Sequence, residues 1–321
     1  MTWDNEATKQ NSFFVSGSKP HYNPDRPGQV KHISLDLVLD LEHHTLYGNC
    51  TIQLDTQGYP IKQLYLDAVD LEIDRVWVNQ ASQNFDHDRR TLRIELQPDL
   101  PVDLAIQVEY HIQHPQRGIY FITPTPDYPD KPLQVWTQGE DEDSRYWFPC
   151  FDYPGQIATS EVRVQVPHQL MAISNGELRQ VTDQGETKTY HWYQPQPHPT
   201  YLITLAVGDF RVVEDQAQNL PVTYYLDQRF SEAAARLTMG KTPQMIEFLS
   251  QTYGYPFPFA KYAQVCVADF IFGGMENTST TLLTDMAVLD QRAALDDLRT
   301  ETLVVHELAH QWFGDLVVIN H

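Results

Sequence analysis

The chain is poor in cysteine and contains no long apolar run. Its 321 residues include three cysteines, Cys50, Cys150 and Cys266, which are scattered and form no Cys-x-x-Cys pair. A disulfide framework is therefore not expected, and a reducing, cytoplasmic setting is predicted. The first residues lack the basic and apolar regions of a secretory signal. No apolar stretch approaches the length that spans a bilayer, so no membrane partner is expected.

Basic residues are also scarce. The chain has 22 Lys and Arg against 43 Asp and Glu, which gives a net charge of −21. Such an acidic chain repels phosphate groups, so neither nucleic acid nor an anionic membrane is expected as a partner. Two interpretations of the acidity stay open. It can attract a cationic group such as a free amine, or it can serve solubility alone.

In the first two thirds of the chain the sequence pattern predicts short strands. Residues 1–28 are polar and proline-containing, and they are predicted to form an arm. From residue 33 to 41 apolar and mostly polar residues alternate, which is typical of a half-buried strand. Similar runs occur at 52–54, 64–66, 71–78, 92–96, 106–112 and 162–166. Many short strands without intervening helices predict an antiparallel sandwich or saddle over residues 29–210.

Helical patterns appear after residue 210, where we place a domain boundary. One strand is predicted at 222–226 and another at 263–269. Ser231 is expected to cap a helix, and Thr242 with Pro243 to form the N-cap and first residue of a second. A long helix is predicted from 296 to about 318. The whole chain is therefore assigned to the α+β class, with residues 211–321 as the second domain.

The segment His306-Glu307-Leu308-Ala309-His310 is the strongest chemical signal. On a helix the two histidines share a face, so both imidazoles can bind one Zn²⁺. Glu307 is turned about 100° away, where it can act on water instead of binding the metal. The apolar neighbours predict a helix that is buried nearly all round. The alternative is a core helix with hydrogen-bonded histidines.

A second motif, Gly273-Gly274-Met275-Glu276-Asn277, lies upstream of the histidines and follows the predicted strand 263–269. Paired glycines beside a strand let another backbone approach closely. An exposed strand edge there can pair with an extended peptide, and Glu276 would place a carboxylate at the peptide's end. The alternative is an ordinary Gly-Gly turn with a surface glutamate.

Taken together, the two motifs resemble those of the zinc aminopeptidases of the M1 family. That family carries Gly-x-Met-Glu-Asn a few dozen residues before His-Glu-x-x-His. The resemblance extends from about residue 30 to the end of the chain. Further matching segments are 137–140, 145–152, 253–259 with Lys261-Tyr262, and 311–315.

The resemblance implies a β-saddle domain followed by a thermolysin-like catalytic domain. It implies that His306 and His310 bind Zn²⁺ and that Glu307 is the catalytic base. Glu276, with Gln138 and Glu140, would hold the free N-terminus of a peptide substrate, since carboxylates form charge-assisted hydrogen bonds with an ammonium group. The remaining substrate-binding residues would be Gly273, Gly274, Met275 and Asn277.

The match departs from the family in three places. The family's third zinc ligand, a glutamate, would fall at about position 329 and its transition-state tyrosine later, both beyond His321. We therefore expect an N-terminal fragment that is inactive alone and lacks a C-terminal catalytic segment. Gly274 stands where alanine is commoner in the family. Glycine also occurs at this position in the family's basic-residue-specific and epoxide-hydrolysing branches. Tyr153 stands where an acidic or small polar residue is usual, so the substrate preference stays open.

The rival hypothesis is a non-catalytic scaffold of the same fold.

Overall fold

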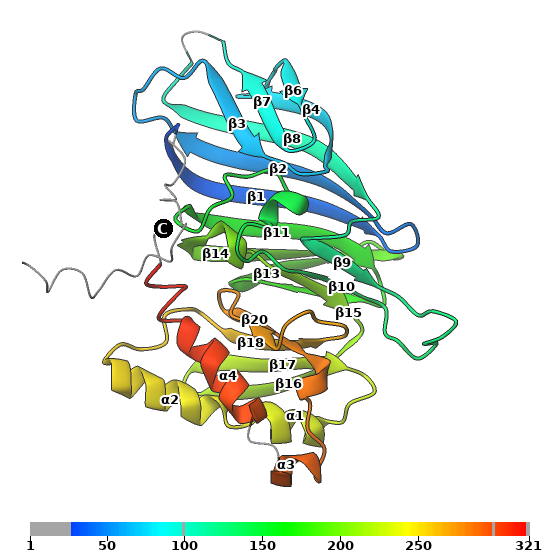
Figure 1. The fold of residues 1–321 in the computed structure, drawn as a ribbon. Coiled ribbons are helices and arrows are strands. Elements are labelled where there is room, and N and C mark those ends of the chain that lie inside the picture. The colour runs from blue at the N-terminus through cyan, green and yellow to red at the C-terminus, as the bar shows by residue number, and fades with distance from the viewer. Residues whose placement is uncertain (1–26, 98–99, 297–298, 319–321) are drawn as a thin grey trace, which may run out of the picture.

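The computed structural model describes residues 27–97, 100–296 and 299–318. It confirms the α+β class. Sheets make up the N-terminal part, and the α-helices of the described chain follow at the opposite end (Figure 1). The arm predicted for residues 1–28 lies almost wholly outside the described residues. Within the described part, every helix falls short of the length and apolarity that a bilayer crossing requires.

An eight-stranded sheet forms the largest layer. Its order is β13-β14-β11-β1-β2-β8-β4-β5. Its strands are β1 (Gln29–Asp40), β2 (Thr45–Asp55), β4 (Glu72–Val78), β5 (Ala81–Ser82), β8 (Asp103–Gln113), β11 (Ile157–Pro167), β13 (Glu177–Asp183) and β14 (Thr187–Pro199). All neighbouring pairs are antiparallel except β1 with β11, which is parallel. The saddle prediction is thus correct apart from this one pair.

Two smaller sheets complete the N-terminal part. One runs β3-β7-β6 and the other β12-β15-β10-β9. Their bounds are β3 (Gln63–Asp67), β6 (Phe85–His87), β7 (Thr91–Glu95), β9 (Ile119–Ile122), β10 (Gln134–Thr137), β12 (Met171–Ser174) and β15 (Leu205–Gly208). Both contribute side chains to the apolar core under the eight-stranded sheet. The alternating residues of β1 lie in this core, with Leu35 fully buried, as their period of two predicts.

A five-stranded sheet begins immediately after β15. Its order is β16-β17-β18-β20-β19, and β17, β18 and β20 run parallel. Its strands are β16 (Phe210–Ala217), β17 (Leu220–Asp227), β18 (Tyr262–Val267), β19 (Gly274–Met275) and β20 (Thr280–Thr284). The chain therefore changes sheet between Gly208 and Phe210. In this sheet β18 is an interior strand, and β16 and β19 are the two edge strands.

Helices cover one face of the five-stranded sheet (Figure 1). They are α1 (Glu232–Met239), α2 (Thr242–Tyr253) and α4 (Arg299–His310). The short helix α3 (Ala293–Asp296) precedes α4 and has no buried residue. Alternate residues of β18 divide between two cores. Tyr262 and Cys266 pack toward the helices, whereas Val265 and Val267 pack toward the N-terminal part. The C-terminal end of α4 points toward the N-terminal sheets.

The predicted helix starts are partly correct. Ser231 caps α1, since its hydroxyl accepts a hydrogen bond from the Ala234 N–H at 3.1 Å. The N-cap assigned to Thr242 is wrong, because Thr242 is already the first residue of α2 and Lys241 precedes it as the cap. The Thr242 hydroxyl instead donates to Gln264 Oε1 at 2.8 Å, which ties α2 to β18.

The single helix predicted from 296 to about 318 is also wrong. α4 ends at His310, and the chain then turns back on itself, with the Asp315 N–H bonded to the His310 carbonyl at 3.1 Å. Gly314 has a φ of 141°, a conformation that L side chains rarely adopt. The turn therefore begins directly after the second histidine.

Candidate metal and peptide site

The two histidines of α4 lie side by side on one face of its last turn. The distance between His306 Nε2 and His310 Nε2 is 3.3 Å. Two ligands each 2.0–2.1 Å from a tetrahedral ion are separated by about 3.3 Å. The pair therefore fits two corners of a zinc site without rearrangement.

A backbone carbonyl orients the second histidine. His310 Nδ1 lies 3.0 Å from the carbonyl oxygen of Phe313, in the turn that follows α4. A hydrogen bond from Nδ1–H to this oxygen leaves the Nε2 lone pair directed toward His306. Metal-binding histidines usually have such a partner on the other ring nitrogen. The early end of α4 thus has a direct effect on the site.

The histidine face of α4 is open. His306 is exposed and His310 is half-buried, with its side chain 34% exposed. The prediction of a helix buried nearly all round is therefore wrong. The apolar residues do cover the opposite side, where Val304 and Leu308 are fully buried. An accessible histidine pair above an apolar base suits a ligand-binding site better than a core helix.

Glu307 lies on the buried side of the pair, against the edge strand β19. Only 4% of its surface is exposed. A Cβ atom on Gly274 would lie 2.5 Å from Glu307 Oε1, so the missing side chain of Gly274 makes room for this carboxylate. Burial raises the pKa of Glu307 to about 8, and the carboxylates of Glu276 and Glu140 act in the same direction. A carboxyl that titrates near neutrality can both accept and return a proton.

The motif 273–277 forms the sheet edge itself. Gly274 and Met275 pair with β20 on one side, and β19 is the last strand of the sheet. The predicted neighbouring strand 263–269 corresponds to β18, which is interior, so the expectation of an edge there is corrected to β19. Gly273 precedes this strand, and a Cβ on it would lie 3.2 Å from the Leu303 side chain on α4. Edge strands can accept an extended peptide as a further strand.

Glu276 and Glu140 approach the histidines from two different parts of the chain. Glu276 is buried, and its Oε1 lies 3.9 Å from His310 Nδ1. Glu140 is exposed and follows β10 from the N-terminal part. Partial burial raises the pKa of Glu140, Glu276 and Asp141 raise it further, and His310 opposes the rise. The structure thus brings both acidic residues to the histidine pair and makes the site strongly negative.

Gln138 and Asn277 line the same region with amide groups. Gln138 Nε2 contacts the Met275 sulfur at 3.1 Å, which joins the residue after β10 to β19. Gln138 Oε1 and both side-chain amide atoms of Asn277 are buried without a hydrogen-bond partner among the described residues. Buried polar atoms without partners are costly, and in native proteins they gather at sites with a further role. All the site residues predicted from the sequence therefore fall within one region.

Two neighbours of this region received no role from the sequence. Gln311 is fully buried directly after His310, and the sequence indicates it only as part of the matching segment 311–315. Tyr201 comes from the N-terminal part and lies near the acidic residues. Burial raises its pKa, and Glu276, Asp315 and Glu140 add to the rise. Tyr201 is far from both motifs along the chain, so no pattern in the sequence indicated its position near the acidic residues.

The matching segment 145–152 is structural rather than part of the site. Arg145 Nε donates to Asp152 Oδ2 at 3.0 Å, and its guanidinium also pairs with Asp67 and Glu142. Asp152 is almost fully buried, and burial raises its pKa to about 7 despite Arg145. This cluster fixes the loop that carries Glu140 to the N-terminal sheets.

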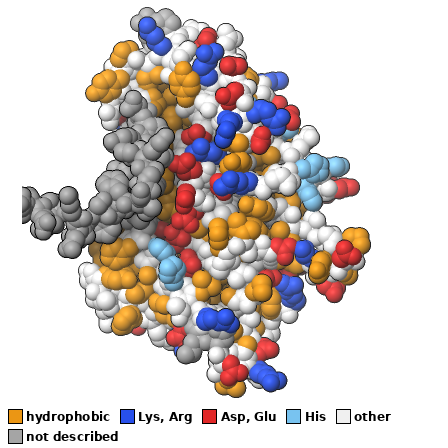
Figure 2. All heavy atoms as spheres, viewed as in Figure 1, with side chains coloured by type: hydrophobic (Ala, Val, Ile, Leu, Met, Phe, Trp, Pro, Cys, Tyr) orange, Lys and Arg blue, Asp and Glu red, His pale blue; other side chains and the backbone are white. Residues whose placement is uncertain are grey.

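The molecular surface agrees with this arrangement. In Figure 2 acidic side chains gather near the middle of the face in view, close to histidine side chains.

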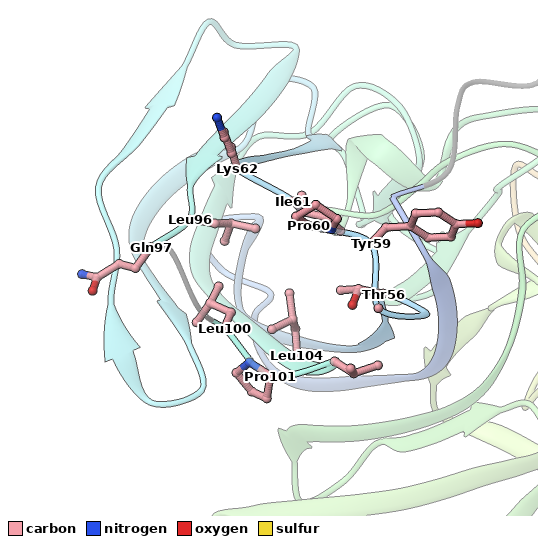
Figure 3. A pocket seen from close by; sticks show the side chains of 12 residues that line it. Thr56, Tyr59, Pro60, Ile61, Lys62, Leu96, Gln97, Leu100, Pro101 and Leu104 are labelled. Carbon is pink, nitrogen blue, oxygen red and sulfur yellow. The ribbon is translucent and has the colours of Figure 1, made fainter.

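By contrast, a cavity of about 590 Å³ in the N-terminal part is lined mainly by apolar side chains such as Leu96, Leu100 and Leu104 (Figure 3). Lys62 is the one charged residue among its described lining. Among the residues that the structure describes, this lining contains no carboxylate, histidine or cysteine.

Known proteins share both parts of the chain. Residues 18–202 match the Peptidase M1 N-terminal domain, and residues 237–321 match the Peptidase family M1 domain. Aminopeptidase M1 of Arabidopsis thaliana is 30% identical over 308 residues, which cover 90% of this chain and 35% of that protein. Probable aminopeptidase 2 of Sulfurisphaera tokodaii is 28% identical over 289 residues, covering 88% and 36%. The chain thus spans about a third of the length of these relatives.

Solved structures share the fold. The M1 zinc metallopeptidase from Deinococcus radiodurans superposes with a TM-score of 0.72 at 23% identity, covering 91% of this chain and 66% of that one. Yeast LTA4 hydrolase gives a TM-score of 0.75 at 21% identity, covering 88% and 44%. The match to the N-terminal domain alone includes more than half of the residues. The chain belongs to the M1 peptidase family.

Proposed function

We propose that this chain carries the histidine pair, the base and the amine anchor of a zinc aminopeptidase. The observation that supports this most strongly is the convergence of two motifs. The His306 and His310 Nε2 atoms are 3.3 Å apart, and a Glu276 carboxylate oxygen lies 3.9 Å from His310. Each motif alone permits a structural explanation, whereas their contact supports a metal position beside a carboxylate.

The substrate would be a peptide with a free N-terminus. Glu276 and Glu140 present carboxylates that can form charge-assisted hydrogen bonds with an α-ammonium group. A peptide bond in the middle of a chain offers no such cation. Because this anchor lies next to the histidine pair, the first peptide bond would reach the metal position, and cleavage would remove one N-terminal residue.

The residues of this chain would divide the work of hydrolysis. A zinc ion between His306 and His310 would supply Lewis-acid chemistry when bound. Glu307 would take a proton from the attacking water and later deliver it to the leaving amine. The free edge of β19 would align the peptide by strand-like hydrogen bonds. Gln138 and Asn277 would add amide groups near the N-terminal residue.

We further propose that the third metal ligand lies past position 321, in a C-terminal segment of the full-length protein. No group of three or more metal-binding side chains occurs among the residues that the structure describes. Two histidines alone bind zinc much less tightly than a complete set. This chain on its own should therefore be inactive. We also retain a cytoplasmic location and the absence of nucleic-acid and membrane partners as predictions.

Two matched proteins test the proposal. Zinc content and aminoacyl-arylamide hydrolysis are measured on this chain and on a form that extends past position 329. The longer form should bind one zinc ion per chain and hydrolyse the arylamide, and the shorter form should do neither well. A longer form that binds zinc fully but hydrolyses nothing would favour the rival hypothesis, a non-catalytic scaffold of the same fold.

A further inference from the structure

The backbone that carries Glu276 is fixed to α4 by one buried side chain. We call residues 276–279, which connect β19 to β20, the anchor loop. Gln311 Nε2 donates to the carbonyl oxygen of Glu276 at 2.7 Å. Gln311 Oε1 accepts from the N–H of Ser279, also at 2.7 Å. A single amide therefore bridges the two ends of the anchor loop.

The opposite side of the anchor loop is bonded to the N-terminal part. Asn175 Nδ2 donates to the Thr278 carbonyl at 2.8 Å, and the Gly176 N–H donates to the Ser279 hydroxyl at 2.8 Å. His198 Nδ1 lies 3.0 Å from the Thr278 hydroxyl. The loop is thus bonded on both sides, and Gln311 provides its side-chain connection to the helix of the histidine pair.

Because of its position in the chain, Gln311 connects the anchor loop to the histidine pair. It directly follows His310, whose Nε2 faces His306. The backbone of Glu276 is bonded to Gln311, and the carboxylate of Glu276 lies near His310. The two hydrogen bonds of Gln311 therefore link the backbone on both sides of the anchor loop to the residue that follows His310.

We propose that Gln311 is a positioning residue that sets the distance between the metal position and the Glu276 carboxylate. This proposal rests on the proposed aminopeptidase function. It deepens that function by naming what selects the first peptide bond. An amide has one acceptor oxygen and two donor hydrogens, so it satisfies a carbonyl and an N–H at once. Removing it leaves two buried backbone groups unpaired, and the loop is expected to move to satisfy them.

The test uses Gln311→Met, which keeps the length of the side chain and removes both hydrogen bonds. In the zinc-loaded protein that extends past position 329 and carries Glu307→Gln to prevent turnover, with and without the change at Gln311, equilibrium binding of L-leucinamide and N-acetyl-L-leucinamide is measured by calorimetry. The ratio of the two affinities should fall about tenfold or more, because the anchor moves relative to the metal position. With arylamide substrates and Glu307 intact, KM should rise more than kcat falls, while the zinc content stays at the wild-type value.

A matched control separates this effect from the loss of any buried amide. Gln264 is equally buried, in the interior strand β18, and accepts a hydrogen bond from Thr242. Gln264→Met should keep the affinity ratio of the wild type. A Gln311→Met protein whose affinity ratio is unchanged overturns the proposal, whether or not the protein keeps its zinc.

A second variant serves if Gln311→Met does not fold. Gln311→Glu keeps the size of the side chain and the acceptor for the Ser279 N–H, but at neutral pH it repels the Glu276 carbonyl. It should also lower the affinity ratio, and a wild-type ratio would overturn the proposal. A wild-type protein that binds both leucinamides equally would instead contradict the aminopeptidase function itself.

Discussion

The N-terminal sheets and the neighbourhood of the anchor loop are both buried, but they are built from different residues. The core of the sheets is aliphatic, with side chains such as Leu35, Leu46 and Ile106 that are essentially unexposed. Around the anchor loop the buried groups are polar or ionisable. The first region gains free energy from apolar burial, whereas the second keeps groups that cost free energy to bury.

Asp315 illustrates the second region most clearly. It is fully buried in the turn after α4, and burial raises its pKa well above the usual value, with Glu276 and Glu307 adding to the rise. A buried carboxyl that lies near two other carboxyls, those of Glu276 and Glu307, does not stabilise the fold. Such perturbed groups gather at functional sites. The comparison teaches that the sheets hold the molecule together, while the anchor-loop neighbourhood holds chemical groups in place.

The largest expected effect comes from removing Glu307, the proposed base. Glu307→Gln in the longer, zinc-loaded protein should lower kcat for arylamide hydrolysis by about a thousandfold, because a general base contributes roughly 10²–10⁴. Zinc content should be unchanged, since the proposed function assigns Glu307 the role of base and not of ligand. Glu301→Gln, an exposed-side change on the same helix, serves as the control and should keep full activity. An undiminished rate in Glu307→Gln would refute the assigned base.

The second prediction concerns the N-terminal sheets. Leu46→Ala, at a fully buried position in β2, should lower the free energy of unfolding by about 2–5 kcal/mol through lost apolar contact and a cavity. Urea denaturation measures this loss. The leucinamide affinity ratio of the folded protein should not change, because the substitution lies in the other region. The comparison would break down if discrimination fell together with stability.

The third prediction is a pH dependence at the junction of the two regions. His198 is buried between Ser160 and Thr278, and burial lowers its pKa to about 3. Between pH 6.5 and 3 the unfolded chain binds a proton at this residue that the folded chain does not, so stability falls as the pH falls. At pH 5 the loss is about 2 kcal/mol.

The variant His198→Gln removes this titration. Its difference in unfolding free energy from the wild type should shrink by about 2 kcal/mol between pH 7.5 and pH 5, as measured by urea denaturation at each pH. A difference that stays constant over this range would show that His198 is not held neutral in the folded protein.

The smallest effect is expected at an exposed ion pair between the starts of α2 and α4. Lys241 Nζ lies 2.6 Å from Glu301 Oε2, and both side chains are substantially exposed. Exposed ion pairs contribute about 0.2–1 kcal/mol. Lys241→Ala should therefore change the free energy of unfolding by less than about 1 kcal/mol and leave activity intact. A loss as large as that of Leu46→Ala would mean that α2 and α4 depend on this pair.

Much of the sheet structure could be predicted, because apolar alternation records the burial of a strand directly. The runs at 33–41 and 106–112 coincide with β1 and β8. The contact between the two motifs was also expected, although through the family resemblance and not through periodicity. Local chemistry at Ser231 was likewise sufficient to place the start of α1.

The remainder depended on contacts that a local pattern does not record. The apolar residues after His310 fit a continuing helix as well as a turn, and Gly314 alone did not decide between them. Gln311 is adjacent to the histidines, but its partners Glu276 and Ser279 are reached only through the fold. Tyr201 has no sequence link to either motif. The residues that support the site are therefore harder to predict than those that define it.

The most direct test of the account compares hydrolysis of two peptides that differ only in N-acetylation. The longer, zinc-loaded protein should show a kcat/KM at least about a hundredfold higher for the free amine, because acetylation removes the cation that the carboxylates are proposed to bind. Glu276→Gln should lose most of this preference. Equal turnover of the two peptides by the wild-type protein would contradict the claim that Glu276 anchors an N-terminus beside the histidine pair.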